Sequence, residues 1–330
     1  MASDPARLAP LDPDLQAVLA ANPNLSVSLL PRHISRLRQM QTEPGRRASA
    51  EILRCGGRVE FEELSIPSSQ PGVNLPLLLL RKRGADKRRP GLCFFHGGGM
   101  VAGDERTGIE AVLEWVHALG LVVASPAYRL APEHPHPAPV EDCYATLRWM
   151  HQQRAALGLD DQPLIVAGLS AGGGLAAGVA LLARARGGPA IGEQVLMYPM
   201  LDDRAAFASS RALKGQGVWD ARSNQTGWEA LLGATKGEPC VPSCAAPSRE
   251  TDLSALPAAY LDVGAVETFR DEVIDYGARL AQAGVSAELH VWAGAFHGFD
   301  LLAPRSAVAM AARAARLDYL RRRLGARVRP

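Results

Sequence analysis

The stretch Leu164-Ile-Val-Ala-Gly-Leu-Ser-Ala-Gly-Gly-Gly174 decides the fold of this chain. Residues 164–167 are a short apolar run, which is typical of a buried strand, and the alanine- and leucine-rich residues 175–185 favour a helix. Between them, Gly-x-Ser-x-Gly predicts a sharp strand-to-helix turn that raises the Ser170 hydroxyl above the sheet edge. The Ala171 N–H and the helix N-terminus would lie beside it, where a developing oxyanion is stabilised. Alone, the five residues fit a glycine-rich helix start with an N-cap serine equally well.

Strands and helices alternate around this stretch. The pattern predicts helices at 15–21 and 34–40, and two strands at 58–66 and 73–81. It then predicts strands at 91–95, 121–125, 163–167, 194–198, 258–263 and 286–292, with helices at about 107–119, 140–156, 173–185, 269–283 and 304–323. Such alternation indicates an α/β fold, a mostly parallel sheet with helices on both faces and an active site at the carboxyl ends of the strands.

Residues 202–250 interrupt the alternation with two helix-like pieces, 204–213 and 224–232, and a loop rich in proline, cysteine and serine. An insertion of this length suggests a functional cap. Trp219 and Trp228 lie in it, and either a core or a pocket-lining role fits both. In the N-terminal segment, Leu11, Leu15 and Leu19 recur at helical spacing, so one apolar face must cover another part of the molecule.

Composition narrows the classes of function. The chain has 330 residues, a net charge of +2 and 47% hydrophobic residues, so no overall field favours nucleic acid or an anionic membrane. The basic residues at 81–89 lack interleaved aromatics and are interpreted as a solvated hairpin tip. No signal peptide or long apolar run is evident, and we expect a soluble, cytoplasmic protein.

The five cysteines are scattered and lack the paired spacing of a zinc site. Cys93 falls in a predicted strand and Cys143 in a predicted helix, so both are expected to be buried. Cys240 and Cys244 could form a disulfide, but a reduced pair is the expectation for a cytosolic protein.

A second glycine-rich segment, Phe94-Phe-His-Gly-Gly-Gly99, ends the strand at 91–95. Consecutive glycines after a buried strand let backbone N–H groups converge on one negative oxygen. A plain turn is the simpler alternative, and the spacing of a phosphate-binding loop is missing. Together with the serine turn about seventy residues downstream, the segment is interpreted as an oxyanion loop.

A serine nucleophile needs a base and an acid that orients the base. Of the downstream histidines, His290 alternates within a strand, whereas His297 follows the last strand in a loop. Asp262 is placed within a strand. Asp271 and Glu272 are placed in the first turn of a helix, where an acidic side chain interacts favourably with the helix dipole. Glu267 follows the strand in a loop, as the orienting acid should. The order Ser170, Glu267, His297 is that of the α/β-hydrolases.

The chain resembles the hormone-sensitive-lipase-like family of α/β-hydrolase esterases over nearly its whole length. The resemblance implies an α/β-hydrolase fold with a helical cap, and Gly98, Gly99 and Ala171 as oxyanion donors. It further implies that residues 1–45 and 202–250 form the cap and that residues 46–201 and 251–330 form the core. The matching segments are His96-Gly-Gly-Gly-Met-Val-Ala-Gly-Asp104, Tyr128-Arg-Leu-Ala-Pro-Glu-His-Pro135, Gly168-Leu-Ser-Ala-Gly-Gly173, Glu267-Thr-Phe-Arg-Asp-Glu272 and His297-Gly-Phe299.

Two residues depart from the usual pattern of the family. Glu267 stands where many relatives carry aspartate, and one more methylene leaves its role unchanged. Leu169 stands before the nucleophile, where an acid is common. We expect Leu169 to alter the stability of the protein or its response to pH, and to leave the chemistry of the reaction unchanged.

By resemblance, the expected function is carboxylesterase activity on short- to medium-chain esters through the triad Ser170, His297 and Glu267, without metal or organic cofactor. The expected partner is a small-molecule ester, with no nucleic acid and no membrane anchor, and the protein is expected to be a monomer or homodimer. Hydrolysis of lactones, amides or drug esters on the same triad is an alternative. A non-catalytic receptor of this fold is a second alternative, but related receptors lack the catalytic histidine, which this chain retains as His297.

Overall fold

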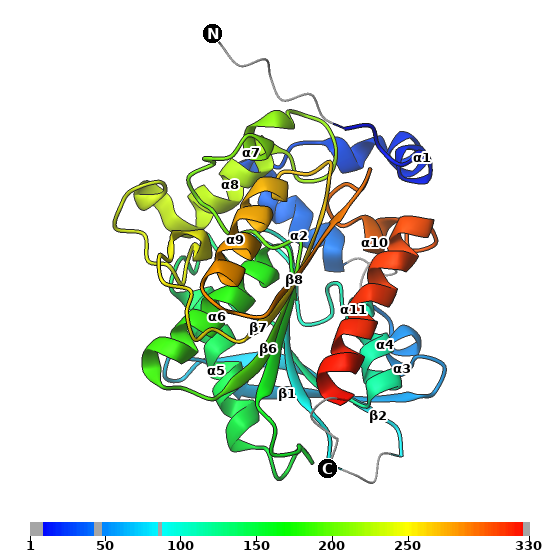
Figure 1. Ribbon diagram of the computed structural model, residues 1–330, viewed down its shortest axis with the longest axis vertical. Coiled ribbons are helices and arrows are strands. Elements are labelled where there is room, and N and C mark those ends of the chain that lie inside the picture. Colours follow the sequence, from blue (N-terminus) through cyan, green and yellow to red (C-terminus); the bar gives the residue numbers. More distant parts are fainter. Residues whose placement is uncertain (1–8, 43–47, 85–87, 326–330) are drawn as a thin grey trace.

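An eight-stranded sheet crosses the molecule (Figure 1) in the order β1-β2-β4-β3-β5-β6-β7-β8. The computed structural model describes residues 9–42, 48–84 and 88–325. β2 pairs antiparallel with β1 and with β4, and all other neighbours are parallel. The strands are β1 Val59–Pro67, β2 Asn74–Lys82, β3 Gly91–Phe95, β4 Val122–Pro126, β5 Leu164–Leu169, β6 Ile191–Met197, β7 Ala258–Gly264 and β8 Ala287–Trp292.

Helices cover both faces of the sheet. α5 (Ala138–Gln152), α6 (Ala171–Arg186) and α9 (Arg270–Gln282) lie on one face, and α4 (Glu110–Leu119) and α11 (Ala307–Gly325) lie on the other (Figure 1). β5 is buried along its whole length, as its apolar sequence requires when helices pack on both sides. The predicted α/β-hydrolase architecture is therefore confirmed.

The observed elements depart from the predicted pattern in four places. α3 (Ala50–Arg54) and α10 (Phe299–Leu302) are single helical turns that have too few residues to show a period. The piece expected at 204–213 is helical only in α7, Ser209–Ala212. The expected hairpin at 81–89 is wrong, because β4 lies between β2 and β3 in the sheet. Its tip, residues 85–87, lies outside the described residues.

The segments predicted to form a cap are neighbours at the carboxyl end of the sheet (top of Figure 1). They comprise α1 (Pro13–Ala21), α2 (Ile34–Thr42), α7 and α8 (Ala221–Leu232). The Ser28 hydroxyl donates to Asp220 Oδ2 (2.6 Å), and the Leu29 N–H donates to Ser223 Oγ (2.8 Å). These bonds join two parts of the chain almost two hundred residues apart in the sequence.

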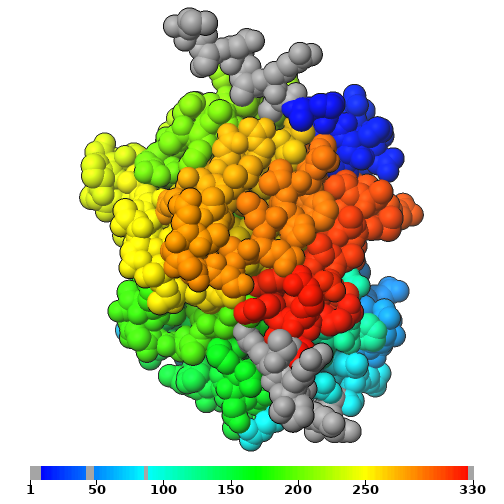
Figure 2. Space-filling view, in the orientation of Figure 1, coloured from blue at the N-terminus to red at the C-terminus, as the bar shows by residue number. Residues whose placement is uncertain are grey.

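The apolar face of α1 packs on the loop that follows β8. Leu15 is fully buried in a cluster with Phe296 and Phe299, and Leu11 and Leu19 pack against the same cluster. Figure 2 shows the blue N-terminal segment lying directly against the orange-red segment that contains α10. Within the described part of the chain, no helix has the length and apolar character needed to cross a membrane.

Candidate active site

Ser170 occupies a strained turn between β5 and α6. Its φ of 57° lies in the left-handed region, at a cost of roughly 1–3 kcal/mol for a residue other than glycine. The flanking glycines make the turn possible: a Cβ on Gly172 would lie 2.0 Å from the Phe95 carbonyl oxygen, and one on Gly168 would lie 2.1 Å from the Gly172 carbonyl oxygen. The serine is thus held where the strand ends and the helix begins, and a glycine-rich helix start with a capping serine is excluded, because the Ser170 side chain caps no N–H group.

The structure brings Ser170, His297 and Glu267 together. His297 Nε2 lies 2.9 Å from Ser170 Oγ, and His297 Nδ1 lies 3.0 Å from Glu267 Oε1. In the tautomer that satisfies both contacts, Nδ1–H donates to the carboxylate and the serine hydroxyl donates to Nε2. The Gly264 N–H donates to the second carboxylate oxygen (2.9 Å). All three side chains are buried, with 5% of Ser170 and 7% of His297 exposed.

The other acids and the other histidine considered from the sequence have different partners. Asp262 pairs with Arg316, and Asp271 pairs with Arg270. Glu272 accepts from the Leu201 N–H (2.7 Å), while His290 contacts Glu288 (3.0 Å). Among these candidates Glu267 is the acid that contacts His297.

Two aromatic rings enclose the His297 imidazole. The Tyr198 ring centroid lies 5.0 Å away at 74°, and the Phe269 centroid lies 5.1 Å away at 82°. Both are edge-to-face arrangements of the kind aromatic pairs prefer. The sequence analysis missed both residues. Phe269 stands within the segment quoted for Glu267, whereas the one signal for Tyr198 is its place directly after β6.

The glycine loop after β3 lies beside the serine. A Cβ on Gly97 would lie 3.3 Å from Ser170 Cβ, and one on Gly98 would lie 2.2 Å from the Ala102 carbonyl oxygen. The loop is supported from below by Tyr128, whose hydroxyl donates to the His96 carbonyl (2.8 Å) and whose ring stacks on the His96 imidazole at 4.1 Å. Burial lowers the pKa of His96 to about 4, so this imidazole is neutral, and its Nδ1 lies 2.7 Å from the Gly97 carbonyl oxygen.

An arginine of the N-terminal segment binds the same loop. Arg38, on α2, donates to the carbonyls of Val101 (2.6 Å) and Ala131 (2.7 Å) and pairs with both carboxylate oxygens of Glu133. The Ala131 N–H in turn donates to the Met100 carbonyl (2.9 Å). One side chain therefore connects the cap to the oxyanion loop and to its supporting segment. No sequence pattern identified it.

Leu169 and Trp219 fill the space around the serine and the loop. Leu169 is buried, and a Cβ on Gly97 or Gly108 would lie 2.5 or 2.7 Å from its methyl groups. Trp219 reaches the loop from the cap insertion, with its ring 2.1 Å from where a Cβ on Gly99 would stand. Trp228, by contrast, is buried in the main core. The two tryptophans thus have different environments.

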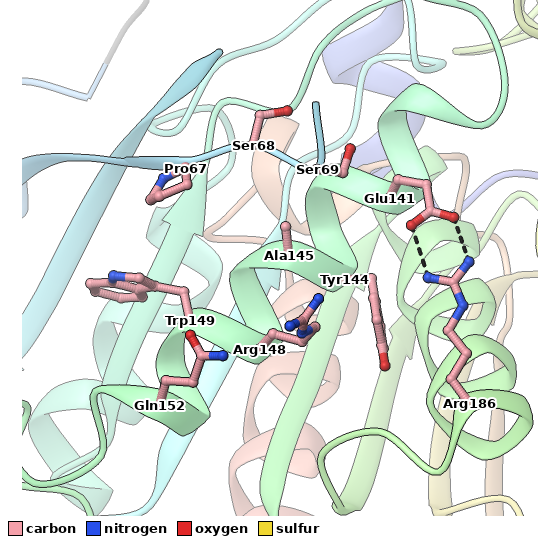
Figure 3. Close-up of a pocket in the computed structure, with 10 residues that line it drawn as sticks. All are labelled: Pro67, Ser68, Ser69, Glu141, Tyr144, Ala145, Arg148, Trp149, Gln152 and Arg186. Carbon is pink, nitrogen blue, oxygen red and sulfur yellow. Dashed lines mark hydrogen bonds and ion pairs between the residues drawn. The ribbon is translucent and has the colours of Figure 1, made fainter. Parts of the chain in front are cut away.

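A surface groove of about 300 Å³ lies elsewhere, along α5 (Figure 3). Its wall includes Tyr144, Arg148 and Trp149, and its Arg186 is paired with Glu141. None of the predicted site residues lines it. We therefore place the candidate active site at the serine and not in this groove.

The cysteines and possible metal ligands form no further site in the described residues. All five cysteines are free thiols, with Cys93 and Cys143 buried as expected and Cys240 unpaired with Cys244. Across the described ranges, no group of three or more histidine, cysteine, aspartate or glutamate side chains is placed to hold a metal ion.

Comparison with known proteins shows the family to which the chain is similar. Residues 92–301 match the family described as alpha/beta hydrolase fold. The chain is 38% identical over 217 residues to Esterase LipI of Mycobacterium tuberculosis. The match spans 64% of this chain and 65% of LipI, which is slightly less than two thirds of the length of that relative. It is 33% identical over 211 residues to human hormone-sensitive lipase, covering 63% of this chain and 19% of the lipase. Among solved structures, a bacterial heroin esterase superposes with a TM-score of 0.83 at 36% identity, covering 95% of this chain and 98% of that one.

Proposed function

The chain belongs to the hormone-sensitive-lipase-like family of α/β-hydrolase esterases, and on that premise we propose that it hydrolyses short- to medium-chain carboxylic esters through an acyl-enzyme on Ser170. LipI and the bacterial heroin esterase are both named as esterases, and other relatives are named as carboxylesterase and carboxylic ester hydrolase. The observation that carries the proposal is the buried row of hydrogen bonds from Ser170 through His297 to Glu267.

In the acylation step, Ser170 Oγ attacks the carbonyl carbon of the ester while His297 Nε2 accepts the hydroxyl proton. Glu267 keeps Nδ1 protonated and stabilises the imidazolium that forms. His297 then gives its proton to the departing alcohol, which leaves Ser170 acylated.

The developing oxyanion accepts hydrogen bonds from the N–H groups of Gly98, Gly99 and Ala171. Donors fixed in this way are worth roughly 3 kcal/mol each, because they are oriented before the charge appears. In the second half of the reaction, water takes the place of the alcohol, His297 accepts its proton, and collapse of the intermediate releases the carboxylic acid.

The enclosure of the site supports the preference for short to medium acyl chains. Ser170 and His297 are almost fully buried, and the Trp219 ring stands against Gly99 at the oxyanion loop. A long acyl chain would have to displace this ring or find another path. Similarity to a heroin esterase makes drug esters a second candidate substrate class on the same triad.

Two experiments test the proposal. In the first, turnover of p-nitrophenyl esters from acetate to palmitate is measured for the protein and for Ser170→Ala. We expect the highest kcat/KM at short to medium chains and no turnover above background for the variant. Fastest turnover of palmitate would overturn the chain-length preference, and heroin included in the series tests the second substrate class.

In the second experiment, an organophosphate is added and the labelled residue is found by peptide mass spectrometry. An intact triad predicts one adduct on Ser170 and none in Ser170→Ala. A receptor of the same fold, without a working triad, would take no label.

We also propose that the protein works in the cytoplasm as a monomer or homodimer, and that its partner is the ester substrate and neither nucleic acid nor a membrane. The five free thiols fit a reducing compartment. Cell fractionation and light scattering of the purified protein test these points.

A further inference from the structure

A charged cluster lies buried behind the catalytic histidine. Arg316, on α11, is 1% exposed and donates through Nε to Asp262 Oδ2 (2.7 Å) and through Nη1 to Asp300. Asp262 lies on β7, and Asp300 lies on α10, three residues after His297. The Tyr198 hydroxyl donates to the other oxygen of Asp300 (2.9 Å). The cluster thus links α11 to the loop of His297.

Stability alone does not account for this cluster. Burying an ion costs several kcal/mol even when it is paired, and apolar residues of similar volume are often as stable. The cluster contains one cation and two carboxyl groups, all buried. Burial raises the pKa of the Asp262 carboxyl, and the Arg316 charge opposes that rise. The directional hydrogen bonds of the cluster fix the positions of Asp262, Asp300 and the Tyr198 hydroxyl relative to α11. Apolar packing would not specify these positions.

Tyr198 connects the cluster to the active site. Its backbone N–H donates to the Asp262 carbonyl (2.7 Å), and its φ is 38°. Its hydroxyl is held by Asp300, and its ring lies against the His297 imidazole. The imidazole has hydrogen bonds only within its plane, to Ser170 and Glu267. Contacts with Tyr198 and Phe269 must therefore limit rotation of the ring about the line between these partners.

We propose that Arg316 and Asp300 are positioning residues for ester hydrolysis, which hold the Tyr198 ring against His297 so that Nε2 stays aligned with Ser170 Oγ. The inference rests on the proposed function, because it concerns the alignment of that triad.

Tyr198→Phe is the sharpest test, since it removes one oxygen and keeps the ring. Loss of the bond to Asp300 frees the ring to move, and small displacements of a reacting group can lower the rate by roughly 10- to 100-fold. We expect kcat on p-nitrophenyl butyrate to fall by about 10-fold with KM unchanged, because the substrate pocket is not altered. The same variant should take the organophosphate label on Ser170 more slowly by a similar factor.

The chain offers a matched control. Tyr319 is also buried and donates to a buried carboxylate, Glu193 Oε2, at 2.5 Å. Glu193 lies near the start of β6, at the opposite end of that strand from Tyr198. Tyr319→Phe removes an equivalent hydrogen bond without touching the triad. We expect it to lower the melting temperature about as much as Tyr198→Phe while leaving kcat within twofold.

The charged partner is tested by Arg316→Met and Arg316→Lys. We expect Arg316→Met to lower kcat like Tyr198→Phe, and Arg316→Lys to restore part of the loss. If Arg316→Met does not fold, Tyr198→Phe decides alone. Equal kcat for Tyr198→Phe and the wild-type protein, or equal losses in Tyr198→Phe and Tyr319→Phe, would overturn the inference. A wild-type protein that neither hydrolyses esters nor takes the label overturns the proposed function, and the inference falls with it.

Discussion

Two parts of the candidate active site are held in place by different means. One is the floor, which comprises Ser170, Glu267 and His297, and the other is the cap, which comprises α1, α2, α7 and α8. Ser170, Glu267 and His297 follow the strands β5, β7 and β8, and the glycines on either side of Ser170 make close backbone contacts. The cap reaches the same site through separate side-chain bonds. Arg38 binds the glycine loop that follows β3, and the Thr268 hydroxyl donates to the Trp219 carbonyl (2.6 Å) next to Glu267. We expect from this difference that ester hydrolysis depends more strongly on the floor than on the cap.

The comparison predicts the largest effect for a change to the floor itself. Glu267→Gln keeps the size of the side chain but removes the charge that fixes the His297 tautomer. We expect kcat to fall by about 10⁴-fold, as when the acid of such a triad becomes an amide. Glu267→Asp is the control, because it keeps the charge with one methylene group less, and it should retain far more activity. A kcat for Glu267→Gln within tenfold of wild type would remove the acid from the mechanism.

The next effect concerns the folding of the floor. A Cβ on Gly172 would lie 2.0 Å from the Phe95 carbonyl oxygen and 2.4 Å from that of His96, and both are backbone atoms. We expect Gly172→Ala to lower the free energy of unfolding by about 3 kcal/mol, the upper end for overpacking. Gly277 on α9 gives the control, since its added Cβ would meet Leu289 at an ordinary 3.4 Å. Gly277→Ala should be neutral or stabilising in the same denaturant titration. Equal losses in the two variants would show that the turn at Ser170 between β5 and α6, which we call the elbow, is not unusually tight.

This contrast also explains how much the sequence could predict. The elbow, the glycine loop, Glu267 and His297 are local patterns, in which neighbouring residues of fixed type follow a strand. The strands themselves follow from apolar runs such as 164–167. These features made the fold predictable, and they are also the basis for choosing Ser170, Glu267 and His297, which the fold brings together.

Tyr198, Arg38 and Arg316 were missed because their roles come from contacts across the fold. Tyr198 is 102 residues from Asp300, and Arg38 is 93 residues from Ala131. A single tyrosine or arginine has no pattern that announces such a partner. The placement of β4 between β2 and β3 was missed for the same reason, because strand order depends on packing between distant segments.

Leu169 lies where the floor meets the oxyanion loop, and its replacement tests whether this contact is only packing. Leu169→Asp loses a buried side chain and places a carboxyl group among Gly97 and Gly108. We expect the free energy of unfolding to fall by about 2–4 kcal/mol at neutral pH. Burial would raise the pKa of the new carboxyl above its unfolded value, so the folded state favours its neutral form. The variant should therefore be least destabilised below about pH 4 and lose stability as the pH rises.

Leu169→Asn separates the charge from the shape, because it is neutral at every pH of the titration. We expect its deficit to be independent of pH, and the two variants to diverge above about pH 4. Parallel curves would show that the carboxyl group finds a compensating partner near the elbow. Unchanged stability of Leu169→Asp would show that an acid is accommodated here.

The smallest effect is expected from the cap, at Arg38. Arg38→Ala removes the donors to the Val101 and Ala131 carbonyls, so the oxyanion loop keeps its support from Tyr128 but loses its bond to the cap. A hydrogen bond from a charged donor contributes roughly 1.5–3 kcal/mol to stability. If about half of this energy is lost from the stabilisation of the transition state, kcat/KM falls about fivefold. Arg36→Ala, an exposed position on the same helix, is the control and should leave kcat/KM unchanged. An effect as large as that of Glu267→Gln would make the cap part of the catalytic machinery. No effect would mean that the oxyanion loop keeps its position without its bonds to Arg38, and that the floor does not depend on this contact with the cap.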